Sequence, residues 1–190
     1  MIRNTVHIWL LALLLCVGCA VKTTHPDIFA AIKAGDIEDV KRFIKKGTNL
    51  ETLQPGTAFT PLIVAVDQNK PQVVELLIEH HAVIEAKDQA GLTPLNRAAY
   101  NNDPEMIRLL IKHKAEVNDG DSRGRQPIHW ATMRNARDAL DALLAAGADI
   151  NATDGWGVTP LKMATDAKNI TLMDYLKQHG AKDSTAVATP

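Results

Sequence analysis

Aromatic residues and serine are scarce in this chain, and catalytic motifs are absent. Aromatic side chains make up only 4% of the 190 residues, so the core must be built from Ala, Leu, Ile and Val. The two serines, Ser122 and Ser184, stand in no nucleophile motif, and the sequence has no GxSxG, no HExxH and no glycine-rich phosphate loop. We therefore expect a chain that is not an enzyme and needs no cofactor, with catalysis as the least favoured alternative.

An excess of charge of one sign is also absent. The chain has 21 Lys and Arg against 22 Asp and Glu, a formal net charge of −1. Surfaces that bind nucleic acid normally carry a strong basic excess, so no nucleic-acid partner is expected. The only cysteines are Cys16 and Cys19. Without later cysteines the chain can form neither a disulfide framework nor a cysteine-based zinc site, and we expect no metal.

Residues 1–19 are typical of an export signal rather than of a folded domain. Arg3 precedes an apolar stretch of about eleven residues that ends at Gly18, shorter than the roughly 20 residues that span a bilayer. The small residues before Cys19 resemble the lipobox of bacterial lipoproteins, although Cys16 stands where that family usually has Leu. The resemblance implies that Cys19 is acylated and anchored in a lipid bilayer. A plain secretory signal and an uncleaved anchor are the alternatives.

The same resemblance predicts where the chain is held. Ala20, rather than Asp, follows the cysteine, which favours the outer membrane of a Gram-negative cell. Residues 20–25 would then form a tether of roughly 20 Å when extended. We expect a lipoprotein of the bacterial cell envelope that faces the periplasm, followed by a folded domain at residues 26–182 and a disordered tail at 183–190.

A period of 33 residues organises the domain. Four motifs begin at this spacing: Thr60-Pro61-Leu62, Thr93-Pro94-Leu95, Gln126-Pro127-Ile128 and Thr159-Pro160-Leu161. An alanine follows each motif at the same offset, at Ala65, Ala98, Ala131 and Ala164. An earlier unit, which contains Ile28 and Ala31, continues the pattern at a spacing of 34. Periods of this length are typical of repeat architectures, in which each unit buries its apolar face against the next.

The pattern resembles the ankyrin repeat, over most of the chain. The resemblance implies an all-α repeat solenoid, an ankyrin array of about five helix-turn-helix units with projecting β-hairpin loops. The units would cover about residues 26–54, 55–87, 88–120, 121–153 and 154–182. Thr93 is expected to cap a first helix with Pro94 in its first turn, and Pro104 to begin a second helix.

Two positions depart from the family. After the second helix the family prefers glycine in a left-handed conformation, as at Gly47, Gly147 and Gly180, whereas two units have His81 and Lys114 there. Each departure should cost about 1 kcal/mol of stability.

The histidines are expected to be structural. His80, His113 and His179 share one repeat position near a helix C-terminus, where the helix dipole favours them. Units stack about 10 Å apart, so these side chains cannot share a metal ion. By resemblance, His129 forms hydrogen bonds between units. Trp130 is expected in the core, and Trp156 either at an exposed loop tip or packed on the neighbouring loop.

Members of the ankyrin family commonly bind proteins through the loop tips and the exposed side of the first helices. Carried onto this chain, that surface predicts partner-binding residues at Phe59, Gln68, Leu92, Tyr100, Asn101, Arg123, Arg125, Met133, Arg134, Trp156 and Val158. Aromatic residues and arginine are common among interface hot spots.

The sequence therefore predicts a non-catalytic protein–protein interaction module tethered in the bacterial envelope. Two roles suit it: neutralising an effector as an immunity protein, or supporting an envelope enzyme. A scaffold lipoprotein without a single high-affinity partner is the alternative. The identity of the partner does not follow from the sequence.

Overall fold

The computed structural model describes residues 24–183. The expected signal segment with Cys19, most of the expected tether and almost all of the expected tail lie outside the described residues. Residues 24–183 form ten α-helices arranged as five consecutive pairs: α2 (Ile28–Ala34) with α3 (Ile37–Lys45), α4 (Pro61–Asp67) with α5 (Pro71–Glu79), α6 (Pro94–Tyr100) with α7 (Pro104–Lys112), α8 (Pro127–Met133) with α9 (Arg137–Ala145), and α10 (Pro160–Asp166) with α11 (Ile170–Gln178).

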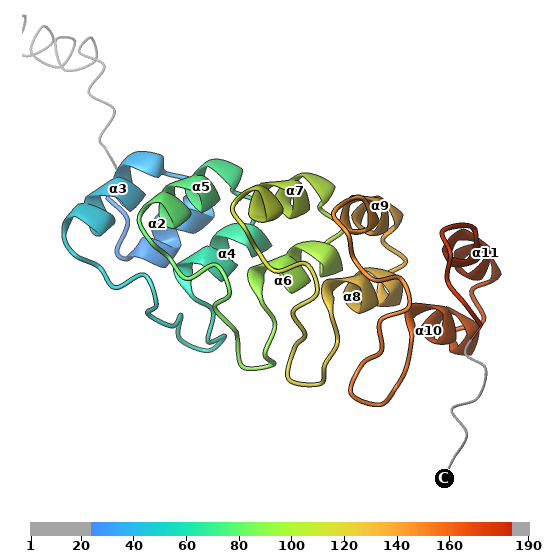
Figure 1. Cartoon of the computed structure of the whole chain (residues 1–190). Coiled ribbons are helices and arrows are strands. Elements are labelled where there is room, and N and C mark those ends of the chain that lie inside the picture. The colour runs from blue at the N-terminus through green and yellow to red at the C-terminus, as the bar shows by residue number, and fades with distance from the viewer. Residues whose placement is uncertain (1–23, 184–190) are drawn as a thin grey trace, which may run out of the picture.

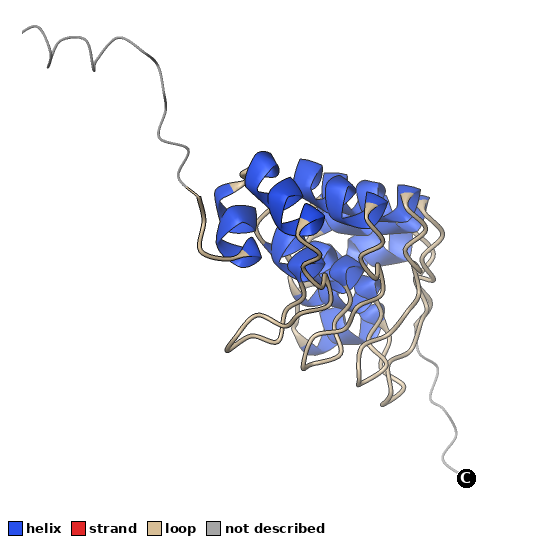
Figure 2. Cartoon of the chain, turned by 90° about the vertical axis from the view of Figure 1, so that its left-hand side faces the viewer, coloured by secondary structure: helices blue, strands red, loops and turns tan. Residues whose placement is uncertain are grey.

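The pairs stack side by side into an elongated, two-layered array. The first helices of the pairs form one layer and the second helices form the other (Figure 1). The loops between successive pairs project together beyond the layer of first helices (Figure 2). The predicted all-α repeat solenoid is confirmed.

The projecting loops differ in one respect from the prediction. No β-strand is present among residues 24–183, so the expected β-hairpins are tight turns without a strand ladder. Two backbone hydrogen bonds close each of the three later loops, for example from the Asp88 N–H to the Leu92 carbonyl at 3.1 Å and from the Gly91 N–H to the Asp88 carbonyl at 2.9 Å. A five-residue loop leaves no room for further pairs, since its two ends continue directly into neighbouring turns.

Local sequence signals account for the helix starts. The hydroxyl of Thr93 accepts a hydrogen bond from the Asn96 N–H at 3.2 Å, and Pro94 follows in the first turn, as predicted. Pro104 begins α7 as predicted, and the side chain of Asp103 caps that helix at the Met106 N–H. These side chains satisfy amides that have no partner within the helix.

Small residues allow neighbouring first helices to pack closely. The alanines at the repeated position are buried in every pair: Ala31, Ala65, Ala98, Ala131 and Ala164. Leucine or isoleucine three residues earlier fills the space between successive units, and the buried side chains form one continuous apolar cluster from Ile28 to Ala181. Stability therefore depends on contacts between pairs as well as on those within each pair.

Polar side chains add a second link between neighbours. At four successive unit boundaries a side-chain oxygen accepts a hydrogen bond from a backbone N–H of the next unit: Glu51 from Val83, Glu85 from Glu116, Asn118 from Asp149, and Asn151 from Lys182. The distances lie between 2.8 and 3.3 Å. These bonds fix the spacing of the successive segments that follow the second helices.

The left-handed turns after the second helices are confirmed. His81 and Lys114 have φ angles of 67° and 74°, in the same region as Gly47, Gly147 and Gly180. A Cβ in this conformation approaches the following backbone, so both residues are strained where glycine would not be.

We predict that Lys114→Gly raises the melting temperature. Relief of about 1 kcal/mol of strain corresponds to a rise of roughly 2–4 °C in a chain of this size, measured by thermal denaturation. The matched control is Gly147→Lys, which places lysine at a left-handed turn where a Cβ would meet no atom within 4 Å. This variant should melt lower by a similar amount, and an unchanged or lower melting temperature for Lys114→Gly would contradict the assignment.

Candidate functional site

Each of the later projecting loops is organised by one buried aspartate. We call residues 54–59, 88–92, 121–125 and 154–158 the finger loops. In the last three, the aspartate Oδ1 accepts hydrogen bonds from the N–H groups two and four residues later, all at 2.8–3.0 Å: Asp88 from Ala90 and Leu92, Asp121 from Arg123 and Arg125, and Asp154 from Trp156 and Val158. The first finger loop lacks this aspartate and closes through a bond from the Gln54 N–H to the Phe59 carbonyl at 2.8 Å.

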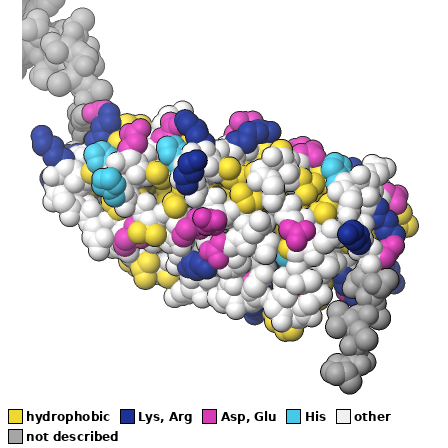
Figure 3. Space-filling model, viewed as in Figure 1, with side chains coloured by type: hydrophobic (Ala, Val, Ile, Leu, Met, Phe, Trp, Pro, Cys, Tyr) yellow, Lys and Arg dark blue, Asp and Glu magenta, His cyan; other side chains and the backbone are white. Residues whose placement is uncertain are grey.

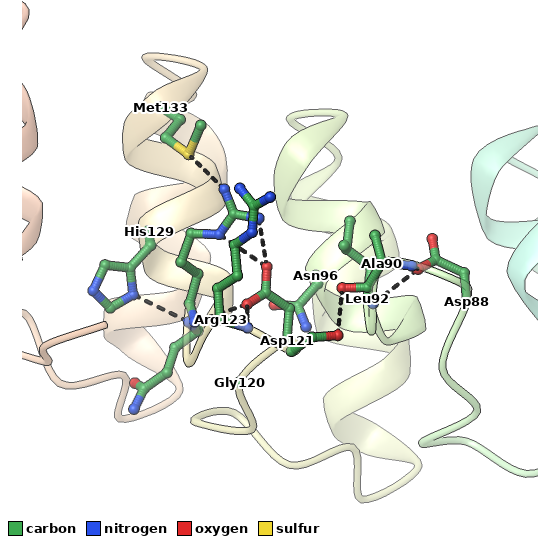
Figure 4. A network of polar contacts seen from close by, with 12 residues as sticks. Asp88, Ala90, Leu92, Asn96, Gly120, Asp121, Arg123, His129 and Met133 are labelled. Carbon is green, nitrogen blue, oxygen red and sulfur yellow. Dashed lines mark hydrogen bonds and ion pairs between the residues drawn. The ribbon is translucent and has the colours of Figure 1, made fainter. Parts of the chain in front are cut away.

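Two of these aspartates also form ion pairs through Oδ2. Asp88 binds Arg97 at 2.7 Å, and Asp121 binds Arg125 at 2.8 Å. Both carboxylates are almost fully buried, so losing either arginine would leave an uncompensated buried charge. Arg125 therefore has a structural role in addition to its predicted place in a binding surface. Figure 4 shows Asp88 and Asp121 in this network of polar contacts.

The last three finger loops are joined by one backbone hydrogen bond and one bond from a side chain to a backbone carbonyl. The Gly155 N–H donates to the Arg123 carbonyl at 2.8 Å, and the Ser122 hydroxyl donates to the Ala90 carbonyl at 2.9 Å. A Cβ on Gly91 would lie only 2.5 Å from the backbone nitrogen of Ser122. Glycine is needed there for this close approach, and the fingers form one connected surface.

Arginine and aromatic side chains alternate along this surface. Arginine guanidinium groups stack over four rings at 4.1–5.7 Å from the ring centres: Arg97 on Phe59, Arg125 on Trp130, Arg134 on Tyr100, and Arg123 on Trp156. Tyr100 and Trp130 also meet edge to face at 5.7 Å. Such contacts hold both partners in defined orientations.

A groove of about 570 Å³ lies at the C-terminal ends of the first helices. It is lined by Val66, Asp67, Asn69, Tyr100, Asn101, Asn102, Asp103 and Arg134. The structure thus brings together three of the predicted binding residues, Tyr100, Asn101 and Arg134. We call the groove and the last three finger loops together the finger face. Figure 3 shows the molecule's surface in the orientation of Figure 1, with charged side chains of both signs spread over it.

The other predicted binding residues differ in accessibility. Trp156 is 65% exposed and Met133 is 52% exposed, which places both on the surface. Gln68 and Arg123 are also exposed, while Phe59, Arg125 and Val158 are partly buried. Leu92 was wrongly included, because it is only 5% exposed and packs in the apolar cluster. The predicted site residues did not include Arg97, which stands nine residues after Asp88 at the same helix position as Trp130.

The core and helix-end expectations are confirmed. Trp130 is buried, and His80, His113 and His179 each stand directly after the last residue of a second helix. One group in residues 24–183 has its side chains close enough to share a metal ion: His25, Asp36 and Asp39. However, Asp39 Oδ2 already binds the guanidinium of Arg42 at 3.2 Å and the N–H of His25 at 2.7 Å. We assign these contacts to holding the chain before α2 against α3.

None of the helices in residues 24–183 has the length and apolar character needed to cross a bilayer.

Comparison with known proteins gives consistent results. A family profile described as ankyrin repeats (3 copies) matches residues 28–121 and 83–154. The chain is similar to the ankyrin repeat and SAM domain-containing protein 6 of Mus musculus and of Rattus norvegicus, with 36% identity over 64 residues in each case. These matches cover 34% of this chain but only 7% of each relative.

His129 links the third and fourth finger loops from within α8. Its Nδ1 accepts a hydrogen bond from the Gln126 N–H at 3.1 Å, so the proton is on Nε2, which donates to the carbonyls of Ala152 at 3.1 Å and Val158 at 3.3 Å. The expected bonds between units are therefore confirmed. Burial lowers the pKa of His129 below its ordinary value, against smaller opposing effects from these bonds and from Asp154.

We predict that His129 makes stability depend on pH near neutrality. The folded chain keeps the imidazole neutral, so below about pH 6.5 the unfolded state binds more protons and stability falls as the pH decreases. Urea denaturation at several pH values between 5.5 and 7.5 should show a smaller slope for His129→Gln than for the parent. His179→Gln, at an exposed helix end, serves as the control; an unchanged slope in His129→Gln would contradict the prediction.

Proposed function

The chain belongs to the ankyrin repeat family, and from that premise we propose that it binds a protein partner through the finger face, without catalysis of its own, while tethered in a bacterial cell envelope. The observation that carries the proposal is the exposed Trp156 beside Arg123, on two loops that are joined by a backbone hydrogen bond. Large aromatic and arginine side chains in fixed positions are typical of interface hot spots. Family members of this kind are generally interaction modules.

The charges of the finger face favour binding to one particular protein over binding to many proteins. Arg97 and Arg125 are committed to buried carboxylates, whereas Arg123 and Arg134 are exposed and form no ion pair within residues 24–183. The groove beside Arg134 carries Asp67 and Asp103. A partner must therefore match both signs of charge, which favours one protein over many.

The proposed tether rests on the sequence of residues 1–19. An acylated Cys19 would hold the folded part within a short distance of the bilayer and restrict it to partners of the envelope. Neutralising an effector and supporting an envelope enzyme are the two roles we propose for it, and the identity of the protein recovered by the experiment below decides between them. The last helix pair, which lies beyond the family match, is proposed as a fifth ankyrin unit on the basis of its matching helix lengths.

We predict that Trp156→Ala combined with Arg134→Ala strongly reduces partner recovery. The full chain would be expressed in its native cell and purified from the envelope with a quantitative mass-spectrometric readout. A protein recovered by the parent should be reduced about tenfold or more in the double variant, as for two hot-spot side chains. Arg125 is left intact because it neutralises buried Asp121.

The matched control is Glu105→Ala combined with Arg108→Ala, an exposed pair on the second-helix layer. This control should recover the same protein as the parent. Equal recovery by all three chains would place the contact away from the finger face, and recovery of nothing specific by any of them would favour the scaffold alternative.

We predict that Cys19→Ala moves the chain from the membrane fraction to the soluble fraction. The parent should incorporate a fatty-acid label at Cys19, and the variant should not. Retention of the unlabelled variant in the membrane would indicate an uncleaved anchor, and a soluble parent would indicate a plain secretory signal.

A further inference from the structure

The three finger aspartates occupy equivalent positions but differ in their charge partners. Two positions supply the arginines that reach these aspartates: the fourth residue after the aspartate in one loop and the ninth in another. Asp88 has Leu92 and Arg97 at these positions, and Asp121 has Arg125 and Trp130. In both loops one of the two positions supplies an arginine, and that arginine binds the aspartate Oδ2 at 2.7–2.8 Å.

An aromatic ring completes each of these two sites. Arg97 lies between Asp88 and the ring of Phe59, 4.6 Å from the ring centre. Arg125 lies between Asp121 and the ring of Trp130, at 4.1 Å. The same arrangement therefore occurs twice: a buried carboxylate, a guanidinium and an aromatic face. A guanidinium suits it because the group binds a carboxylate and stacks on a ring at the same time.

The last finger loop has the buried carboxylate and, at a different position in its turn, an aromatic ring, but neither of the two arginine positions carries a cation. Val158 and Met163 occupy the positions four and nine residues after Asp154, and neither carries a charge. Asp154 is 8% exposed, and within residues 24–183 its Oδ2 forms no ion pair or hydrogen bond, while Oδ1 is used by Trp156 and Val158. The ring of Trp156, in the same turn, is largely exposed.

The neighbouring basic side chains do not fill the gap. Arg123 stacks on Trp156 at 5.7 Å but forms no ion pair with Asp154 in the described part of the chain. His129 is directed by its Nε2 proton to the carbonyls of Ala152 and Val158. Within residues 24–183, Asp154 Oδ2 thus has no partner, and the exposed Trp156 stands two residues later in the same turn.

We propose that the last finger loop is a receptor for an arginine side chain of the partner protein, which binds Asp154 Oδ2 and stacks on Trp156. The proposal rests on the proposed function, since it specifies the chemistry of the partner at that same face. It commits to a guanidinium because the chain itself uses arginine at both equivalent sites. The partially buried Val158 and Met163 provide an apolar surface for the methylene groups of the incoming side chain.

The first test uses short peptides. An acetylated and amidated Gly-Arg-Gly peptide is titrated into the isotope-labelled full chain, and the backbone N–H signals of Trp156 and Val158, which bond to Asp154, are followed by NMR. These signals should shift with the arginine peptide. The citrulline peptide is nearly isosteric but uncharged. Its affinity should be lower by about tenfold or more, as expected for loss of a charge-assisted hydrogen bond. Equal affinity of the citrulline peptide would overturn the proposal, and equal affinity of a lysine peptide would overturn the choice of arginine.

The second test fills the site from within the chain. Met163→Arg places an arginine at the position that Arg97 occupies relative to Asp88, so it should raise the melting temperature and abolish the peptide-induced shifts. Ile170→Arg, at an exposed position on α11, is the matched control and should change neither. Asp154→Asn keeps an oxygen for the two N–H groups and should also abolish binding. Unchanged peptide binding in folded Met163→Arg would overturn the proposal.

The two proposals fail in distinguishable ways. Peptide binding needs no protein partner, so a negative titration together with a partner lost by the Trp156 and Arg134 variant would remove only the arginine site. A positive titration with no recovered partner would leave the site in place and contradict the proposed function.

Discussion

The central constraint on this chain is that no helix pair can cover its own apolar surface. Each pair is short, with a seven-residue first helix and a nine-residue second helix, and its buried side chains face the neighbouring pairs. The repeated alanine and the leucine or isoleucine before it are buried in all five pairs, including the two end pairs that have a single neighbour. Capping threonines, left-handed turns and side-chain bonds between units have a common effect. They hold neighbouring pairs at the spacing that this apolar packing requires.

The finger face shows how the same repetition produces differences. Three aspartates hold three turns in the same way, through two backbone N–H groups each. Because Oδ1 alone accepts both backbone N–H groups, the partner of Oδ2 can differ from unit to unit. In two units it binds an internal arginine, and in the last it does not. The common turn and the variable charge are thus separate properties of one side chain.

Much of the fold was predictable from the sequence, and less of the site. The Thr-Pro signals and the 33-residue period accounted for the helix starts and the repeated alanines, and the left-handed turn at Lys114 was expected by resemblance to the family. Burial of individual loop residues did not follow: Leu92, Arg125 and Val158 share one repeat position, yet one is in the core, one pairs with an aspartate and one is partly exposed. The β-hairpins were expected by resemblance, and the loops proved too short for a ladder. The Asp88–Arg97 pair joins residues nine apart, and Arg97 lies at a position where the next two units have tryptophan and methionine, so periodicity alone did not reveal the pair.

The backbone contacts between the fingers affect the entropy of recognition. Gly155 and Ser122 join adjacent loops by hydrogen bonds, and Gly91 allows an approach that a side chain would prevent. A partner that docks on loops already ordered in this way restricts few torsion angles that were free before. Differences in affinity between related partners would then reside mainly in how long each complex lasts rather than in how fast it forms.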